Sequence, residues 1–198
     1  MFRRHASGDA RWIVFGLGNP GPRYEGTRHN AGARVVETLL ERSGGRLKAH
    51  KSGALIAEVD VGGDRAVLAR STGYMNDSGN PVSKLMRWYK SRPDRLIVVH
   101  DEIDIPFGEI RIKSNGGTAG HNGLRSISDH LGTKEFTRVR FGASRPRQTR
   151  GAADHVLAEF NATERKELPH LLEAAADAVE MIISYGVERA MNEVNTRK

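Results

Sequence analysis

Short apolar runs typical of β-strands alternate along the chain with apolar positions at helical spacing. Strands are predicted at Trp12–Gly16, Ala54–Val61, Ala66–Ala69, Leu96–His100, around Ile110 to Ile112, and at Thr137–Gly142. The second and third flank Gly62, Gly63 and Asp64, which predicts a hairpin. The run Leu96–His100 is expected in the middle of a sheet.

Helices are predicted between these strands. The first has an apolar face of Ala33, Val35, Val36, Leu39 and Leu40 and stops at Gly44 and Gly45. A second is marked by Val82, Leu85, Met86 and Tyr89, and a short one ends near Leu131. The last is capped by Asn161 or Thr163, has Pro169 near its first turn or at a kink, and carries a core stripe from Leu168 to Ile183. This alternation predicts an α/β fold.

Charge and composition narrow the class of protein. In 198 residues, 31 Lys and Arg stand against 24 Asp and Glu, and the pI is about 10.0. This balance favours a polyanionic partner, although a merely basic protein is the alternative. The length fits one domain, two at most. The absence of Cys excludes disulfide scaffolds, zinc ribbons and thiol nucleophiles.

The sequence shows neither a membrane-spanning segment nor a secretory signal. No apolar run approaches the about 20 residues of a membrane helix. Residues 1–11 hold Arg3, Arg4 and Arg11 but no apolar stretch, so they predict a loosely attached leader, not a secretory signal. We therefore expect a soluble cytoplasmic protein with its domain at 12–198.

The segment Gly16–Gly21 satisfies the glycine pattern of dinucleotide-binding folds. That function needs a helix that opens inside the motif. Here Pro20, Pro22 and Gly26 predict a loop, and helical periodicity begins only near Ala31. The acidic residue required about 20 positions later would be Glu37 or Glu41, inside a helix. We reject the dinucleotide interpretation.

Polar residues gather in loops and at strand ends next to glycine, where α/β sheets place their sites. They are Asn19, His29, Asn30, Asn76, Asp101, Glu102, Asp104, His121 and Asn122. Asp101 follows a predicted strand, and His29 closes the loop after the first strand. If these strands are neighbours, the carboxylate orients the imidazole as a general base. With no Cys and no nucleophilic serine motif, the nucleophile is expected to be water.

Each of these residues has a structural alternative. His29 could satisfy a backbone group beside the next helix, and Asp101 could pair with a surface arginine, as Glu102 and Asp104 are expected to do unless they cap a turn. Asn19, before Pro20, is a common turn residue, and Asn76 and Asn122 could cap helices. A metal site of His29, Asp101 and His121 is the less favoured reading, because no closely spaced ligand motif supports it.

A glycine-rich loop, Ser114–Gly123, is followed and preceded by basic residues. Glycine allows the backbone to approach a ligand and the loop to move, although a merely mobile surface loop is possible. The basic residues are Arg111, Lys113, Arg125, Lys134, Arg138, Arg140, Arg145, Arg147 and Arg150. Their concentration favours a track for a phosphate backbone over a solvated surface.

Four blocks of sequence resemble the bacterial peptidyl-tRNA hydrolase family. They are Gly16–Gly21 with Tyr24 and Thr27–Gly32, then Tyr74–Gly79, His100–Asp104 and Gly116–Leu124, in the family's order. The resemblance implies a monomeric, single-domain α/β fold with a twisted, mostly parallel mixed sheet surrounded by helices. It implies hydrolysis, without metal or other cofactor, of the ester between a peptide and the 3′-terminal ribose of tRNA, with the acceptor stem and 3′ end bound.

The resemblance also implies residue roles. His29 would be the base, Asp101 its orienting carboxylate, and Asn19 the sensor of the acylated α-nitrogen. Substrate or tRNA contacts are implied for Tyr24, Tyr74, Met75, Asn76, Asn122, His121, Lys113 and Arg140. The chain departs from the family at Arg70–Gly73, where Lys-Pro-x-Thr is usual, and at Gly142–Ser144, where Gly-x-Gly is usual.

Two other functions remain open on the sequence alone. One is a non-catalytic RNA-binding relative of the same fold, which the intact His, Asp and Asn residues disfavour. The other is a small-molecule hydrolase or nicotinamide enzyme, for which the basic tract would have no purpose.

Overall fold

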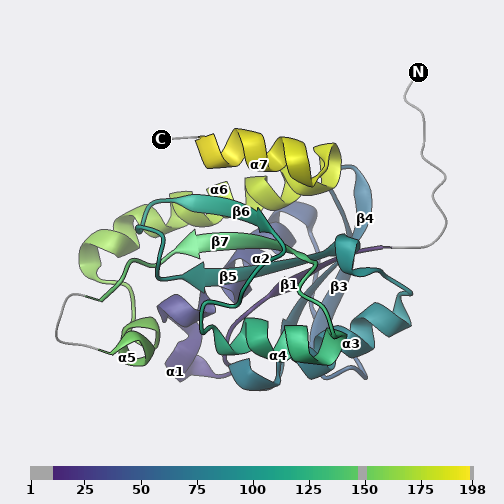
Figure 1. Cartoon of the computed structure of the whole chain (residues 1–198), viewed down its shortest axis with the longest axis horizontal. Helices are drawn as coiled ribbons and strands as arrows, with labels where there is room; N and C mark the ends of the chain where they lie inside the picture. Colours follow the sequence, from purple (N-terminus) through teal and green to yellow (C-terminus); the bar gives the residue numbers. More distant parts are fainter. Residues whose placement is uncertain (1–10, 147–150, 197–198) are drawn as a thin grey trace.

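A computed structural model describes residues 11–146 and 151–196, in which a single mixed sheet is enclosed by helices (Figure 1). The strands of this part of the chain are β1 (Trp12–Gly16), β2 (Lys48–Ala49), β3 (Ala54–Val61), β4 (Asp64–Ser71), β5 (Leu96–Glu102), β6 (Ile110–Ser114) and β7 (Thr137–Gly142). Its helices are α1 (Pro22–Glu25), α2 (Ala31–Ser43), α3 (Gly79–Trp88), α4 (Asn122–Leu131), α5 (Ala152–Val156), α6 (Ala162–Tyr185) and α7 (Val187–Thr196).

The centre of the sheet is parallel and its edges are antiparallel. The strand order is β2-β3-β4-β1-β5-β7-β6, with β1 parallel to both β4 and β5 and β5 parallel to β7. Because β1 and β5 are neighbours, the loops that follow their carboxyl ends lie at the same edge of the sheet. From the sequence, His29 and Asp101 are expected to meet if these two strands are neighbours, and they are neighbours.

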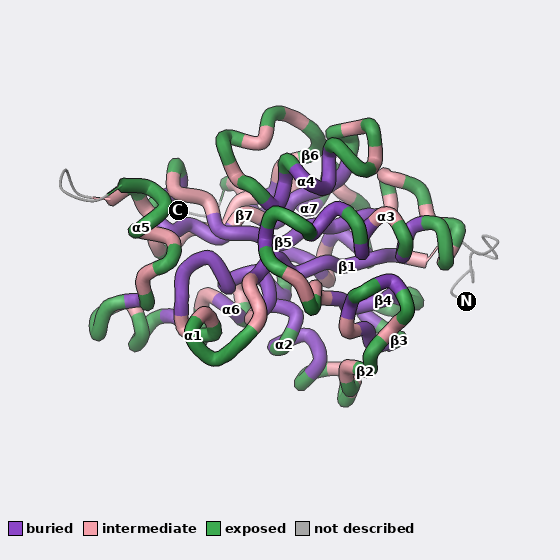
Figure 2. Tube along the Cα trace, turned by 90° about the horizontal axis from the view of Figure 1, so that it is seen from below, coloured by how far each residue is buried: buried purple, intermediate pink, exposed green. Residues whose placement is uncertain are grey.

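Alternation along the strands divides the core into two layers. Trp12 and Val14 of β1 face a layer with α2, α6 and α7, while Ile13 and Phe15 face α3 and α4. Figure 2 shows β1 and β5 as buried tube in the middle of the molecule. Strands buried on both faces need apolar residues throughout, which is why β1 reads as a continuous apolar run.

The predicted strands and helices are found, and three α-helices and one strand were missed, as were the 3₁₀ helices Arg28–Asn30, Met75–Asp77 and Pro93–Arg95. The last predicted helix is α6, capped by Asn161 in a capping box with Glu164. Pro169 lies inside this helix, beyond its first turn and on its exposed side. The sequence patterns failed to predict α1, α5, α7 and the two-residue strand β2, since these are short or follow another helix directly.

The glycine motif serves close packing between α2 and the sheet. A Cβ on Gly16 would lie 2.3 Å from the carbonyl oxygen of Gly32, and one on Gly32 would lie 2.1 Å from that of Val99. Helix α2 can approach β1 and β5 this closely only because both positions are glycine. The long helix begins at Ala31, as expected, although the four-residue helix α1 interrupts the predicted loop.

None of the helices in the described ranges is both long and apolar enough to cross a membrane. Of the predicted leader, residues 1–10 lie outside the described residues. Arg11 is described: its carbonyl accepts a hydrogen bond from Ser91 Oγ at 2.7 Å, and its guanidinium pairs with Glu58.

Candidate active site

A cavity of about 550 Å³ opens at the carboxyl ends of β1 and β5. Its wall includes the following residues: Asn19, His29, Tyr74, Met75, Asn76, Asp101, Glu102, Ile103, Ala119, Gly120, His121, Asn122, Ala152, Ala153, Val156 and Leu157. Eight of the eleven site residues predicted from the sequence lie in this wall. The other three are Tyr24, Lys113 and Arg140.

Asp101 binds two histidines in the wall of the cavity. It is the penultimate residue of β5 and 3% exposed, and it accepts hydrogen bonds on one oxygen, Oδ1. His29 Nδ1 lies 2.9 Å from that oxygen and His121 Nε2 lies 3.1 Å from it. The alternatives of a surface arginine for Asp101 and of a backbone partner for His29 are therefore wrong, since the two side chains bind each other.

The hydrogen bonds assign the protons on both rings. His121 Nδ1 faces the backbone N–H groups of Gly123 and Leu124, at 3.1 and 3.4 Å, so it accepts and the proton is on Nε2. His29 donates its Nδ1 proton to Asp101, which leaves Nε2 with a lone pair. An oriented imidazole with a free Nε2 can accept a proton from water.

The two histidines also decide the charge of Asp101. Burial raises the pKa of this carboxyl, but electrostatic interaction with His29 and His121 and the hydrogen bonds that they donate outweigh burial and hold the pKa well below its usual range. A carboxylate that stays ionised stabilises the imidazolium that forms when His29 accepts a proton.

His100 is a second buried histidine next to this pair. It is 1% exposed, donates Nδ1–H to the Asp101 carbonyl at 2.7 Å, and meets the His121 ring at 5.1 Å edge to face. Burial, followed by electrostatic interaction with His121, lowers the pKa of His100 to about 3. His100 is therefore a neutral packing residue under His121, with Nε2 buried and unpaired.

Asn19 is held by hydrogen bonds that direct its amino group. Asn30 binds the backbone of Asn19 twice, at 2.9 Å each. Asn19 Oδ1 accepts the backbone N–H of Met75 at 2.8 Å, which joins the loop after β1 to the loop before α3. With its oxygen engaged, Asn19 offers N–H donors to the cavity. The residue thus has the structural role considered from the sequence and also lines the cavity.

Asn76 and Asn122 line the cavity rather than cap helices. The side chain that caps α4 is that of His121, and Asn122 is the first residue of the helix. Asn122 Oδ1 accepts from Arg125 at 2.8 Å, so it too has N–H donors to spare. Asn76 lies in a short 3₁₀ helix, Met75–Asp77, without a capping hydrogen bond from its side chain.

The aromatic residues stand at the edge of the cavity. Tyr74 is 55% exposed, and its ring meets that of Tyr24 at 6.3 Å, edge to face. Tyr24 therefore contacts a wall residue without lining the cavity itself. Met75 is buried, and a Cβ on Gly123 would clash with its sulfur at 2.6 Å.

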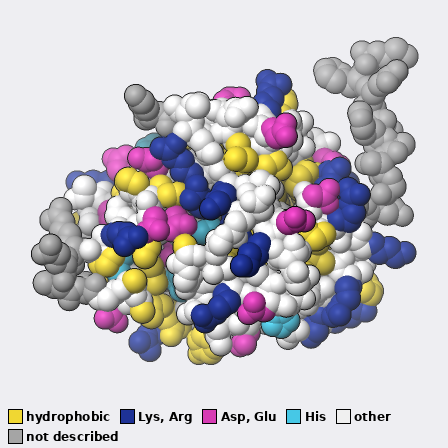
Figure 3. All heavy atoms as spheres, in the orientation of Figure 1, with side chains coloured by type: hydrophobic (Ala, Val, Ile, Leu, Met, Phe, Trp, Pro, Cys, Tyr) yellow, Lys and Arg dark blue, Asp and Glu magenta, His cyan; other side chains and the backbone are white. Residues whose placement is uncertain are grey.

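The expected basic track is divided by its hydrogen bonds. Arg138 and Arg140 share one face of β7, opposite Lys113 and Arg111 of β6. Arg138 is 2% exposed and donates to the carbonyls of Gly116 and Gly117, at 2.6 Å each, so it supports the glycine-rich loop. Figure 3 shows a short run of basic side chains left of the centre of the visible face, with other basic side chains scattered apart from it.

The other arginines of the tract are mostly paired. Arg111 binds Glu109, Arg125 binds Asn122, and Arg145 binds Asp104 at 2.7 Å. Asp104 has the role of an ion-pair partner that was expected of it, and Glu102 accepts the backbone N–H of Asp104 at 3.3 Å. Lys113 and Arg140 have no ion-pair partner within the described residues, and Arg147 and Arg150 lie outside them.

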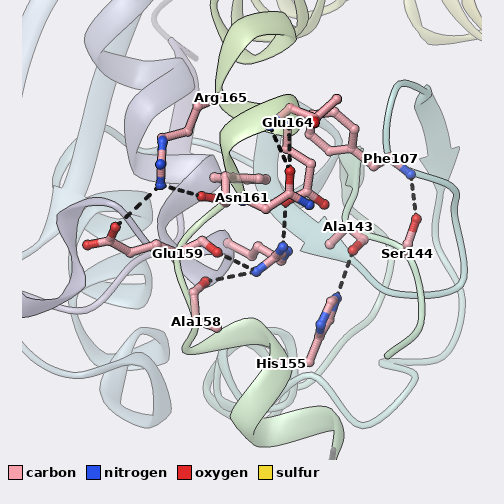
Figure 4. Close-up of polar contacts among 12 residues, drawn as sticks. Phe107, Ala143, Ser144, His155, Ala158, Glu159, Asn161, Glu164 and Arg165 are labelled. Carbon is pink, nitrogen blue, oxygen red and sulfur yellow. Dashed lines mark hydrogen bonds and ion pairs between the residues drawn. The ribbon is translucent and has the colours of Figure 1, made fainter. Parts of the chain in front are cut away.

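An apolar wall from α5 was not predicted from the sequence. Ala152, Ala153, Val156 and Leu157 follow helical spacing, but over too few residues to give a signal. Two anchors hold this segment: His155 Nε2 lies 2.9 Å from the Ala143 carbonyl, and buried Arg28 donates to the carbonyls of Ala158 and Glu159. Figure 4 shows His155 pointing toward Ala143, with Glu164 beside Asn161.

Arg28 joins this wall to the loop that carries His29. Its second guanidinium nitrogen lies 2.5 Å from Glu164 Oε2, and its carbon sits 5.3 Å from the centre of the Phe160 ring. The pair is almost wholly buried, so removal of either partner would leave an unpaired charge in the interior.

One departure from the resembled family has a structural consequence. Ser144, where glycine is usual, has φ of +56°, a left-handed conformation that is costly for residues with a Cβ. Its Oγ accepts the backbone N–H of Phe107 at 2.8 Å, which offsets part of that cost. At the other departure, Ser71 Oγ accepts the N–H of Gly73 at 2.9 Å and so shapes the loop before Tyr74.

His29, Asp101 and His121 are also the group that could hold a metal ion, since their ligand atoms lie within 4.8 Å of one another. In the observed arrangement the histidine nitrogens that face Asp101 are protonated donors. A metal would have to displace both protons before these nitrogens could ligate it.

Comparison with known proteins gives a consistent result. A family model described as "Peptidyl-tRNA hydrolase" matches residues 13–198. A peptidyl-tRNA hydrolase of Frankia casuarinae is 58% identical over 186 residues, covering 94% of both chains, and one of Leifsonia xyli is 51% identical, covering 93% of this chain and 97% of its own. The crystal structure of peptidyl-tRNA hydrolase from Acinetobacter baumannii is 34% identical, covers 98% of both chains, and has a TM-score of 0.89.

His100 predicts a pH dependence of stability that a substitution should remove. Because its pKa is lowered on folding, the unfolded chain binds a proton near pH 6.5 that the folded chain refuses until about pH 3. Stability should therefore fall as pH falls from 6.5 to 4, by on the order of 3 kcal/mol. The pKa of Asp101 is also lowered on folding, so Asp101 reduces the stability of the fold further only below about pH 4.

The measurement is urea unfolding at several pH values for the wild type, His100→Asn and the exposed control His170→Asn. His100→Asn should flatten the dependence between pH 6.5 and 4, while His170→Asn should follow the wild type. Parallel curves for all three proteins would contradict the assignment of His100 as a buried neutral group.

Proposed function

The chain belongs to the peptidyl-tRNA hydrolase family, and we propose that it cleaves the ester between a peptide, or an N-blocked amino acid, and the 3′-terminal ribose of tRNA. The observation that carries the assignment to this cavity is the free Nε2 of His29, oriented by buried Asp101. The non-catalytic relative is not favoured, since named hydrolases match nearly the whole chain.

In the proposed reaction, His29 Nε2 removes a proton from a water that attacks the ester carbonyl. Asp101 stabilises the resulting imidazolium and keeps Nδ1 protonated, while His121 donates a second hydrogen bond to the same oxygen of Asp101. The proton then passes to the leaving 3′-oxygen, so that ester and water become a ribose hydroxyl and a carboxylic acid, which releases its proton to solvent near neutral pH. Asn76 and Asn122 position substrate and water, and the N–H donors of Asn122 suit the developing oxyanion.

Asn19 is proposed to distinguish acylated from free α-nitrogen. Its oxygen is engaged by Met75, so it turns N–H donors toward the substrate. Such donors bind the carbonyl oxygen of a peptide or acyl group and repel the N–H donors of a free ammonium. Tyr74, Met75 and, through Tyr74, Tyr24 would border the same part of the substrate.

For the tRNA, we propose that Lys113 and Arg140 bind phosphates of the acceptor stem near the 3′ end. Partial burial lowers the pKa of Arg140, and its Nε is buried without a hydrogen-bond partner, so its guanidinium would gain from an anion. We further propose that residues 12–198 act as one domain, that the protein is a monomer, and that it works in the cytoplasm without a cofactor.

The proposed activity is tested with N-acetyl-aminoacyl-tRNA as substrate, with and without EDTA. Release of the N-acetyl-amino acid at equal rates in both conditions supports water activated by His29. Loss of cleavage in EDTA would instead support the metal reading of His29, Asp101 and His121, and no cleavage in either condition would refute the proposed activity.

His29→Ala should lower turnover by about 10²–10⁴, because a general base contributes that much to the rate. Affinity for tRNA should stay close to wild type, since the imidazole does not bind phosphate. Asp101→Asn should also lower turnover, because an amide neither fixes the tautomer of His29 nor stabilises its charge. Single-turnover kinetics and tRNA binding check this pair, and near-wild-type turnover in both variants would contradict the roles.

Asn19→Asp should weaken discrimination against free aminoacyl-tRNA. One carboxylate oxygen can still accept the Met75 N–H, so the loops stay joined, while the other presents a negative charge that attracts the ammonium. The quantity to measure is the ratio of cleavage rates for acetylated and free aminoacyl-tRNA. An unchanged ratio would leave Asn19 with its structural role alone.

Lys113→Ala and Arg140→Ala should each weaken tRNA binding and reduce its salt dependence by about one phosphate contact. The measurement is a binding titration in the His29→Ala background at several salt concentrations. The control Lys166→Ala removes one exposed charge from α6 and should leave the slope unchanged. Equal slopes for all variants would mean that the RNA lies elsewhere on the molecule.

A further inference from the structure

A second hollow, distant in the sheet order from Lys113 and Arg140, combines positive charge with an aromatic ring. We call it the Trp88 hollow. Its volume is about 320 Å³, and its lining residues are His50, Lys51, Ser52, Lys84, Arg87 and Trp88. They come from the turn between β2 and β3 and from the last turns of α3. None of the six was implicated by the sequence analysis.

The charge of the Trp88 hollow is not neutralised. Lys51, Lys84 and Arg87 are exposed and have no ion-pair partner within the described residues. The reason lies in the sequence, because the segments 42–57 and 78–93 both lack Asp and Glu. The fold brings these two segments together, and Figure 3 shows basic side chains gathered at the lower right, the part of the molecule where Figure 1 draws α3.

Trp88 is the aromatic part of the hollow. Its side chain is 53% exposed, in contrast to Trp12, which is 5% exposed in the core. Lys51 Nζ lies 3.5 Å from the centre of the Trp88 ring, and the His50 ring meets it edge to face at 5.6 Å. A half-exposed indole with a cation held against it offers a surface for a flat ring next to a site for an anion.

The turn that carries His50 is rigidly built. His50 Nδ1 faces the backbone N–H of Ser52 at 3.2 Å and the buried Ser52 Oγ at 3.0 Å, so Nδ1 accepts and Nε2 carries the proton. The next residue, Gly53, accepts two hydrogen bonds from Thr72, one from its N–H and one from its hydroxyl. The turn is thereby fixed to the loop that leads to Tyr74 and the catalytic cavity.

We propose that the Trp88 hollow binds an unpaired nucleotide of RNA, with the base packed on the exposed part of Trp88 and the adjoining phosphate held by Lys51, Lys84 and Arg87. Three cations without an ion-pair partner favour a phosphodiester as the ligand. The indole offers a stacking surface for a base, which an acidic peptide does not have. The inference rests on the proposed function for the kind of polymer that the protein meets.

The position of the hollow makes it a separate contact from Lys113 and Arg140. Those two residues lie on β6 and β7 at one edge of the sheet, and the Trp88 hollow adjoins β2 and β3 at the other. The catalytic cavity lies between them, at the ends of β1 and β5. Strands β3 and β7 are four strand spacings apart, roughly 19 Å. A substrate held at both edges would have its ester held over the middle.

Trp88 supplies its own probe for the test. Because Trp12 is buried, a base that stacks at the hollow should quench the fluorescence of Trp88 alone. The titrant is an unstructured uridine hexanucleotide, with a polyglutamate of equal charge as the comparison. We expect quenching by the oligonucleotide that weakens as salt is raised, little effect of polyglutamate, and loss of the signal in Trp88→Phe.

Variants assign the signal to the hollow. Lys84→Ala and Arg87→Ala should each weaken the oligonucleotide affinity several-fold, whereas Lys166→Ala, an equal loss of charge on α6, should not. The proposal is overturned if the oligonucleotide leaves Trp88 fluorescence unchanged, if polyglutamate quenches it equally, or if all three variants bind alike. None of these readings requires ester cleavage, so failure of the hollow and failure of the proposed activity are distinguishable.

Discussion

The rest of the candidate site depends on one buried carboxylate. Asp101 is 3% exposed, and a charge in that position is stable only when donors satisfy it. His29 and His121 supply the two donors, both to Oδ1. This requirement fixes the tautomer and direction of each ring, and the free Nε2 of His29 is a consequence. A neutral residue at 101 would remove the reason for both histidines to stand where they do.

Close backbone packing brings the partners of Asp101 to it. Helix α2 begins just after His29 and lies against β1 and β5 through Gly16 and Gly32. The N–H of Leu17 binds the carbonyl of Val99, and the N–H of Ala33 binds that of Leu17, so the loop after β1 is tied at its start and its end. Gly16, the first residue of the segment that satisfies the dinucleotide pattern, and Gly32 therefore help to set the distance between His29 and Asp101.

Residues in long apolar patterns and in glycine-flanked loops were predictable, while residues placed by tertiary contacts were not. Strands β1 and β5 were predicted from continuous apolar runs, and the places of His29 and Asp101 at strand ends made their pairing possible on the condition, met only in the fold, that these strands are neighbours. The wall on α5 escaped prediction because five residues give too little periodicity. His100 also escaped, because nothing in a strand's sequence says that its polar residue will be buried under His121.

The net charge of +7 shows why charge must be read together with partners. Three arginines stabilise the fold. Arg28 pairs with Glu164, and Arg42 pairs with three acidic residues of α6. Arg138 donates to the loop carbonyls of Gly116 and Gly117. Among the described cations that have no ion-pair partner are Lys113 and Arg140, on β6 and β7, and Lys51, Lys84 and Arg87 in the Trp88 hollow. A polyanion responds to these unpaired charges, since a paired arginine would have to give up its carboxylate before it bound a phosphate. The distribution of partners, more than the sum of charges, therefore decides where an RNA can lie on this molecule.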